Sequence, residues 1–260
     1  MQPSPAIQKL LTECRAHLEP GNFEECRLIL EAFDYVADGF YIEVGANDPR
    51  QNSLTYILER LGWTGLLIDP LRKCYEKLVR DRPRSRCFHC ACVSADKTGR
   101  ITLHAPDPAS VVATVEKNVD DFDLTYGYTE TCDAVTLESL VQQVGPPRID
   151  FLSIDTEGTE LDVLQGFDLS RHRPRLILLE DKLYNLAKHH YLLGQRYRLV
   201  KRTMLNNWYV PAESGALKIY TSLGERLQLW RKMNPLSVHF RRKRREQRMR
   251  DAGMTAQPLR

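Results

Sequence analysis

The sequence has no long uninterrupted apolar run, and this absence limits the kinds of protein it can encode. No stretch approaches the roughly 18 apolar residues that a membrane-spanning helix needs. The first residues, MQPSP, also lack the basic segment and apolar core of a secretory signal peptide. We therefore expect a cytoplasmic protein rather than an integral membrane or secreted one.

An even set of cysteines is lacking too, because the chain has seven, scattered along its length. A disulfide framework is not expected, and a reducing cytosolic compartment fits better. The group Cys87, Cys90 and Cys92 resembles a zinc knuckle on paper, but this segment is predicted to be a strand. Residues three apart on a strand point to opposite faces, so Cys87 and Cys90 would not converge on a metal. No metal site is predicted there.

The net charge of +3 is small, but it is unevenly distributed. Residues 241–260 contain eight Lys/Arg and two Asp/Glu, so they carry +6 and the remaining residues sum to −3. With 260 residues, 42% of them hydrophobic and 27% charged, the chain has the composition of a soluble globular protein. We expect a helical segment over 1–37, one main domain over 38–220 and a basic helix or tail over 221–260.

Apolar runs alternate with amphipathic segments along most of the chain. The predicted strands are 40–45, 66–68, 87–93, 150–154 and 176–179, with a hairpin arm at 101–103 and a terminal β pair within 196–210. The predicted helices are two short ones within 5–36, one that Ser53 caps and Gly62 ends, one around 71–80, one with its apolar stripe at 137–144 and one from Thr159. Residues 105–132 are polar without a clear period, and we expect a long loop that helps to shape a substrate pocket. Strands alternating with helices predict an α/β protein with a parallel, doubly wound sheet.

Two of the predicted strands, about a hundred residues apart, end in carboxylates and a glycine. The first runs into 43–48 (EVGAND) and the second into 155–158 (DTEG). Ligands bind at the carboxyl edge of an open α/β sheet, so two such ends on one edge indicate a cofactor end and a reaction end. The chain is therefore expected to be an enzyme.

The first strand end favours a cationic nucleoside cofactor over a dinucleotide. Gly45 lets the backbone pass close to a ligand, and Glu43 and Asp48 supply carboxylates. Asp69 ends the next strand, 24 residues after Gly45, where a carboxylate can accept both hydroxyls of a ribose. The dinucleotide motif G-x-G-x-x-G is incomplete, because the loop reads GANDPR. Glu43 has an alternative role as a strand acid or a partner in a helix cap.

Longer segments carry a family resemblance. Residues 41–48 (YIEVGAND), 52–70 (NSLTYILERLGWTGLLIDP) and 149–167 (IDFLSIDTEGTELDVLQGF) strongly resemble FkbM-type methyltransferases, and 196–200 and 206–211 resemble that family's closing strands. The resemblance covers about 38–212, and its most specific part is D-x-E-G-x-E. It implies a class I, S-adenosylmethionine-dependent, Rossmann-like fold with about seven strands. It also implies, usually, O-methylation of a hydroxyl group on a sugar, polyketide or other small molecule.

The resemblance assigns roles to individual residues. Glu43, Gly45, Ala46 and Asn47, with the adjacent Asp48, would surround the methionine part of the cofactor; Asp69 would hold the ribose; and Val93 and Ser94 would approach the adenine through backbone groups. Two positions depart from the family. The family often has a glycine at the position of Pro49, and the proline removes one N–H donor from the loop. The family commonly has a glutamate at the position of Asp69. Aspartate is one methylene shorter but offers the same hydrogen-bond acceptors.

The second strand end is expected to hold a base. An acceptor hydroxyl is a poor nucleophile while protonated, so a carboxylate within hydrogen-bond reach should take its proton. The candidates are Asp155, Glu157 and Glu180, followed by Lys182 and His190. Neighbouring carboxylates raise one another's pKa, which suits a base, and the same group could hold a divalent cation that orients and acidifies the acceptor. Alternatively, Glu157 and Glu160 cap the helix that begins near Thr159.

The end of the chain has three readings. A basic run at 240–250 (FRRKRREQRMR) follows apolar residues, among them Trp230, that could form one helical face. This segment could be a solvated tail, or it could dock on an anionic membrane surface with Trp230 and Phe240 dipping in. Nucleic acid ranks last, because the body is acidic and lacks a nucleic-acid motif. Two rival functions stay open: an NAD-type oxidoreductase, and a non-catalytic nucleoside-binding module tethered by this tail.

Overall fold

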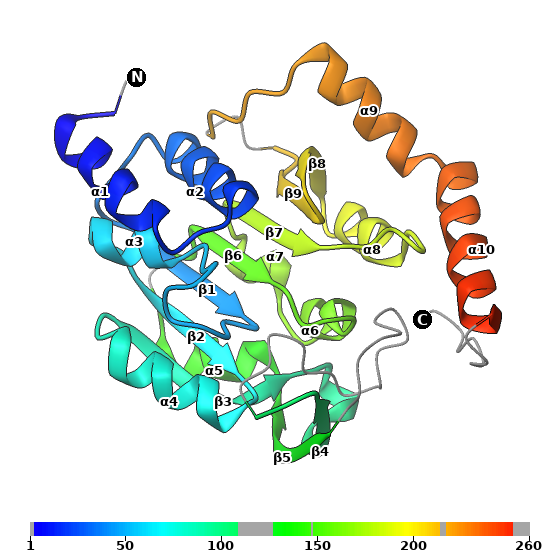
Figure 1. Cartoon of the computed structure of the whole chain (residues 1–260), viewed down its shortest axis with the longest axis horizontal. Helices are drawn as coiled ribbons and strands as arrows, with labels where there is room; N and C mark the ends of the chain where they lie inside the picture. Colours follow the sequence, from blue (N-terminus) through cyan, green and yellow to red (C-terminus); the bar gives the residue numbers. More distant parts are fainter. Residues whose placement is uncertain (1–2, 109–126, 147, 214–216, 252–260) are drawn as a thin grey trace.

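The computed structural model describes residues 3–108, 127–146, 148–213 and 217–251, and its centre is a single sheet with helices on both faces (Figure 1). The strands are β1 (Phe40–Val44), β2 (Thr64–Asp69), β3 (Ser85–Cys92), β4 (Gly99–Ala105), β5 (Tyr128–Val135), β6 (Phe151–Ile154), β7 (Leu176–Glu180), β8 (Tyr197–Thr203) and β9 (Asn206–Pro211). The helices are α1 (Pro5–Arg15), α2 (Pro20–Ala32), α3 (Tyr56–Leu61), α4 (Arg72–Asp81), η1 (Ala95–Lys97), α5 (Leu137–Val144), α6 (Glu160–Gln165), α7 (Leu169–His172), α8 (Ala187–Gly194), α9 (Leu223–Met233) and α10 (Pro235–Asp251).

The strand order is β4-β5-β3-β2-β1-β6-β7-β9-β8. The predicted α/β class is confirmed, but two details of the sheet were wrong. The sheet is mixed rather than parallel, because β9 runs antiparallel to β7 and β8, and β4 runs antiparallel to β5. It also has nine strands rather than about seven, since β4 and β5 extend the sheet beyond β3.

The missed strand β5 lies at the end of the stretch that was expected to be a loop. Its inward side chains, Tyr128, Glu130, Cys132 and Ala134, alternate with exposed ones, because only one face of this hairpin is covered. Polar residues occur among the inward and among the exposed positions, so the sequence of β5 does not show the alternation of apolar and polar residues that predicts a strand. Residues 109–126, the rest of the expected loop, lie outside the described part of the chain.

The central strands divide their side chains between two hydrophobic cores. On β1, Tyr41 packs with α1, α2 and α3, whereas Ile42 packs with α5, α6 and α8. The apolar run Leu66-Leu67-Ile68 on β2 splits in the same way, with Leu67 on the first face and its neighbours on the second. Burial on both faces explains why these strands read as continuous apolar runs.

The register of the parallel strands brings their carboxyl ends to one edge. Val44 pairs with Ile68 of β2 and with Ile154 of β6, and Ile154 pairs with Leu179 of β7. The residues that follow these four positions are Gly45, Asp69, Asp155 and Glu180. The fold thus places the predicted cofactor end and reaction end next to each other.

The chain after β9 forms α9 and α10, which extend along the side of the molecule (Figure 1). Ser222 and Glu225 form a capping box at the start of α9, which fixes where this helix begins. The basic run lies on α10, and residues 252–260 are outside the described chain. None of the described helices is both long and apolar enough to cross a membrane.

Candidate active site

A small cavity lies at the carboxyl edge of the sheet, where the loops after β1, β2 and β6 meet. Its lining consists of Val44, Gly45, Asn47, Ile68, Asp69, Pro70, Leu71, Cys90, Ala91, Cys92, Leu103, Asp155, Thr156, Glu157 and Thr159. Five of the predicted site residues are in this set: Gly45, Asn47, Asp69, Asp155 and Glu157. Its volume of about 60 Å³ is below that of usual ligand pockets, so a nucleoside could enter only if lining side chains moved apart.

Gly45 follows β1 at the point where the chain lies against the end of β6. Its φ angle is +85°, and a Cβ at this position would lie 1.7 Å from the backbone oxygen of Asp155. The N–H groups of Gly45 and Ala46 both donate to the carbonyl oxygen of Ile68, at 2.9 and 3.1 Å. The first strand end therefore depends on glycine for its conformation and for its contact with the second strand end.

Asp69 is buried at the end of β2 and faces the cavity. Its two carboxylate oxygens accept hydrogen bonds from the backbone N–H groups of Leu71 and Asn47, at 2.9 and 2.8 Å. Burial raises the pKa of Asp69 to about 6, although these two hydrogen bonds oppose the shift. Each oxygen keeps further lone pairs, so the group can still accept hydrogen bonds from a ligand.

Glu43 does not line the cavity. It points to the other face of β1, where its carboxylate accepts hydrogen bonds from the hydroxyl groups of Thr55 at 2.5 Å and Ser53 at 3.3 Å. Burial raises the pKa of Glu43, and the nearby guanidinium of Arg82 partly offsets this effect. Glu43 thus braces the loop that follows β1, and a direct contact between this residue and a cofactor stays a prediction.

Four other predicted cofactor contacts also lie outside the lining. Ala46 is buried in the core beside α1–α3, and the carboxylate of Asp48 caps the N–H groups of Arg50 and Gln51. Val93 and Ser94 are buried just after β3, one or two residues beyond the part of that strand that reaches the cavity. The contacts of Val93 and Ser94 with an adenine stay a prediction.

The sequence reasoning missed the apolar wall of the cavity. Leu71, Cys90, Cys92 and Leu103 provide it, from the loop after β2, from β3 and from β4. The motif-based signal stopped at Asp69, and the cysteines of β3 were considered as metal ligands or as small core residues, without a role at the cofactor site. Leu103 could not have been assigned, because the hairpin that carries it was not recognised as part of the sheet.

The acidic residues at the reaction end form a compact cluster. Asp155, Glu160 and Glu180 each bring one carboxylate oxygen within 4.8 Å of the others. Asp155 is open to the cavity, whereas Glu160 and Glu180 are buried behind it. Three carboxylates at this distance repel one another, so the cluster favours retention of a proton.

The pKa shifts in this cluster follow its charges. Desolvation by the surrounding protein, and then the charges of Glu180 and Glu157, raise the pKa of Asp155 well above its usual value. Burial, and then the charges of Glu157 and Glu160, raise the pKa of Glu180 to about 7. Because the charge of each carboxylate acts on the other, Asp155 and Glu180 titrate as a pair.

Two lysines balance part of this negative charge. The Lys182 ammonium lies 3.2 Å from Glu157, and that of Lys188 lies 3.0 Å from Glu160 and 2.9 Å from the carbonyl oxygen of Glu180. Lys188 was not a candidate, because the sequence did not predict the bounds of α8, the helix that carries it.

Glu160 has a structural role in the loop before α6. Its carboxylate accepts hydrogen bonds from the N–H groups of Gly158 at 2.8 Å and Thr156 at 3.2 Å, which lie before the helix rather than in its first turn. Burial alone would raise the pKa of Glu160, but Lys188 and the Gly158 N–H outweigh it and lower the pKa. Glu160 therefore clamps the loop that carries Asp155 and Glu157, instead of capping the helix as the alternative held.

The cysteines and histidines do not form a comparable cluster in the described part of the chain. Cys87, Cys90 and Cys92 lie on strand β3, as predicted, and all seven cysteines of the chain are free thiols. Among the described residues, the acidic cluster is the only group of three or more potential ligands close enough to share an ion. His190 is exposed on α8, and a role for it at the reaction end stays a prediction.

The sequence and the fold were compared with known protein families and solved structures. Residues 43–198 match the family model described as the methyltransferase FkbM domain. A solved structure described as methyltransferase FkbM from Methylobacillus flagellatus KT is 16% identical, with a TM-score of 0.46, over 79% of this chain and 58% of that one, so this chain spans little more than half of that relative. No curated protein matches the chain. Because the family model covers more than half of its residues, this protein belongs to the FkbM methyltransferase family.

Proposed function

We propose that the protein transfers a methyl group from S-adenosylmethionine to a hydroxyl group of a sugar, glycan or other small molecule. The observation that carries this proposal is the shared cavity at the sheet edge. Asp69, which can accept hydrogen bonds from hydroxyl groups, and Asp155, which can accept a proton, line the same space. A cofactor end and a reaction end in one cavity suit group transfer between two bound molecules.

The residues of the cavity fit such a cofactor. Asp69 has lone pairs left for the ribose hydroxyl groups, and Leu71 and Leu103 offer an apolar surface to a nucleobase. Asp155 and Glu157 add negative charge, which favours a cofactor that carries positive charge. When bound, S-adenosylmethionine supplies an electrophilic methyl group.

The protein's part in the reaction is positioning and proton transfer. We assign the proton acceptor to the carboxylate of Asp155, because it is the member of the cluster that is open to the cavity. Glu180 lies behind it and raises its pKa, which makes Asp155 a stronger base than an ordinary aspartate. Glu180 is therefore a positioning residue, and Lys182 partly neutralises the charge of Glu157 through an ion pair.

The rival functions predict different binding and activity. An NAD-type oxidoreductase needs glycines where Asn47 and Arg50 stand, so that the backbone can approach a pyrophosphate. We expect calorimetric titration to detect S-adenosylhomocysteine and not NAD, and tritiated methyl groups to appear on a hydroxylated acceptor in a panel of sugars and glycans. Tight NAD binding without S-adenosylhomocysteine binding would overturn the proposal. A non-catalytic module would bind the nucleoside and keep its biological activity after Asp155→Asn.

Substitution of Asp69 tests its contact with the ribose. Asp69→Asn keeps the shape of the side chain but removes the charge, and we expect the affinity for S-adenosylhomocysteine to fall about 10- to 100-fold. The wild-type affinity should also fall as the pH is lowered through about 6, because burial has raised the pKa of Asp69 to that range and protonation removes acceptor capacity. Isothermal titration at several pH values checks both effects. Glu76→Gln, an exposed acid on α4, is the control, and equal affinities for both variants would contradict the role.

Substitution of Gly45 tests the contact between the two strand ends. In Gly45→Ala the new Cβ would meet the backbone oxygen of Asp155, so either strand end must shift. We expect methyl transfer to fall about 100-fold, as displacements near 1 Å do in other sites. Gly145→Ala is the matched control: its φ angle is +65°, but no atom lies within 4 Å of the added Cβ. It should lower the melting temperature slightly and leave methyl transfer intact.

A further inference from the structure

Helix α9 exposes an unusual amount of apolar surface. Leu223, Leu227 and Trp230 lie at i, i+4 and i+7, so they share one face, and they are 74%, 55% and 66% exposed. No residue of α9 is buried. Most helices in proteins are stabilised by packing of their apolar face, which α9 lacks on this side.

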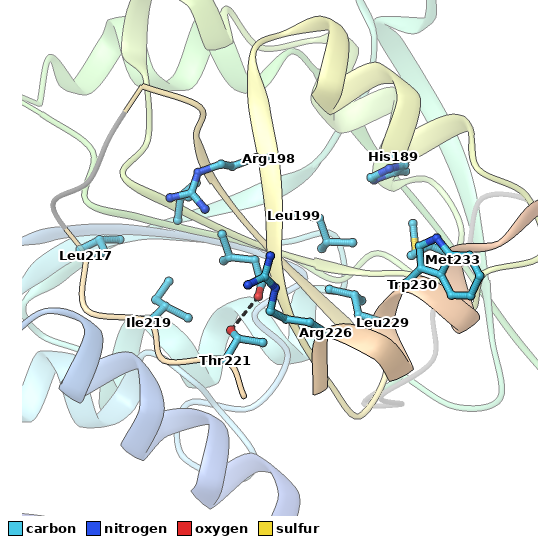
Figure 2. A pocket seen from close by; sticks show the side chains of 12 residues that line it. His189, Arg198, Leu199, Leu217, Ile219, Thr221, Arg226, Leu229, Trp230 and Met233 are labelled. Carbon is cyan, nitrogen blue, oxygen red and sulfur yellow. Dashed lines mark hydrogen bonds between the residues drawn. The ribbon is translucent and has the colours of Figure 1, made fainter. Parts of the chain in front are cut away.

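The inner side of α9 is also packed loosely. Figure 2 shows Arg226 and Leu229 of α9 near β8, and Met233 and Trp230 together below His189 of α8; all five residues line one cavity. This cavity has a volume of about 550 Å³, and its walls include Leu199 of β8. Helix α9 therefore stands beside the edge strand of the sheet instead of being embedded in the body.

Helix α10 continues the exposed apolar surface and is anchored on its other side. Leu236 and Phe240, one turn apart, are 68% and 60% exposed. Val238, Arg245 and Met249 are buried, and the Arg245 guanidinium lies 5.2 Å from the centre of a tyrosine ring in the loop after β7. The helix is thus held against the body while Leu236 and Phe240 stay in solvent.

The same two helices concentrate the positive charge of the protein. Residues 223–251 contain ten Lys/Arg and three Asp/Glu, a net charge of +7, whereas the rest of the chain sums to −4. Lys243, Arg244 and Arg248 are exposed, as are the basic residues near the end of α9. Exposed Leu, Trp and Phe side chains among basic ones are typical of helices that lie in the interface of an anionic bilayer.

We infer that α9 and α10 dock this protein on an anionic membrane surface, with Trp230 and Phe240 entering the interface and the basic side chains contacting lipid phosphates. Charge complementarity selects this occupant. A second copy would bring another +7 against the same face, and the apolar side chains have no partner on a phosphate backbone of nucleic acid. The inference is independent of the methyl acceptor and of the active-site assignment.

Vesicle co-sedimentation of the full chain tests the inference. The protein should bind vesicles of phosphatidylcholine with 30% phosphatidylglycerol and show little binding to pure phosphatidylcholine. Its binding to the anionic vesicles should weaken as the salt concentration rises. Replacing Lys243, Arg244 and Arg248 together by Gln should lower the binding constant about 100-fold. Replacing Lys9, Lys73 and Arg100 together by Gln removes the same charge elsewhere on the surface and should have little effect.

The apolar contribution is tested separately. Trp230→Ser with Phe240→Ser should lower vesicle binding at least about 10-fold, whereas Val36→Ser with Val79→Ser, at exposed sites on other elements, should not. Circular dichroism checks that each variant is folded. The inference would be overturned if the protein did not bind anionic vesicles, or if it bound duplex DNA instead. A dimer that buries Trp230, with the dimer itself detected by analytical ultracentrifugation, would also overturn it.

Discussion

Replacing Asp155 by Asn should slow methyl transfer about 100- to 10,000-fold, the usual contribution of a positioned base. The asparagine side chain has nearly the same shape but cannot take the proton of the acceptor hydroxyl. Binding of S-adenosylhomocysteine should stay within a few fold of wild type, because Asp69, on another strand, is the residue assigned to the ribose. Single-turnover transfer of a tritiated methyl group measures the first quantity, and calorimetry measures the second.

The pH profile separates the base from the residue that tunes it. Glu180 raises the pKa of Asp155, so Glu180→Gln should lower that pKa. Because the base must be ionised to act, the rate of the variant should begin to rise at a lower pH than that of wild type. A merely structural role for Glu180 would lower the rate at every pH without moving the profile.

Asp162 supplies the control for these measurements. It lies on α6, a few residues after Asp155, and pairs with Lys97 at 2.6 Å, outside the cavity lining. Asp162→Asn should leave both the rate and the profile unchanged. If Asp155→Asn transferred methyl groups as fast as Asp162→Asn, Asp155 would not be the base.

The sequence was sufficient for the features that repeat along the chain. Buried strands such as β2 read as continuous apolar runs, and their ends at Gly45, Asp69 and Asp155 fall at one edge because parallel strands share their direction. The hairpin of β4 and β5 was harder, since one of its faces is solvated and its inward positions include polar residues such as Glu130. Only the pairing of β5 with β3 makes that segment part of the sheet.

Residues that act through distant contacts could not be predicted. Lys188 reaches Glu160 across 28 positions of the sequence, and Arg82 reaches Tyr41 across 41 positions. No local pattern marks a lysine or arginine that will be buried or partly buried, because most such residues are exposed. The hydrogen bonds of Glu43 had the same limit, because the motif alone does not indicate that Ser53 and Thr55 bind its carboxylate.

The buried Arg82 holds together the loop between β1 and α3. Its guanidinium donates hydrogen bonds to Glu59 at 3.0 Å, to the hydroxyl groups of Tyr41 and Thr55 at 2.9 Å, and to the hydroxyl of Ser53 and the carbonyl of Pro49 at 3.2 Å. Thr55 and Ser53 in turn donate to Glu43. One cation thus stabilises two buried carboxylates and the backbone of the loop that begins at Gly45.

Arg82→Met should therefore lower the free energy of unfolding by about 3–5 kcal/mol, because the buried Glu59 loses the guanidinium that pairs with it while both carboxylates stay buried. Urea unfolding measures this change. Arg80→Met, at an exposed position in the last turn of α4 two residues before Arg82, should leave the free energy of unfolding almost unchanged. Equal losses in the two variants would show that the network contributes nothing.

The pH dependence of the Arg82→Met deficit identifies its cause. Burial already raises the pKa of Glu43 in the folded protein, and loss of the guanidinium removes the charge that offsets this shift. A carboxylate whose pKa is higher in the folded than in the unfolded state destabilises the fold once the pH exceeds its unfolded value, and protonation relieves that penalty. The deficit should consequently be largest at neutral pH and shrink as the pH falls and Glu43 becomes protonated, whereas a deficit caused by lost packing alone would stay constant.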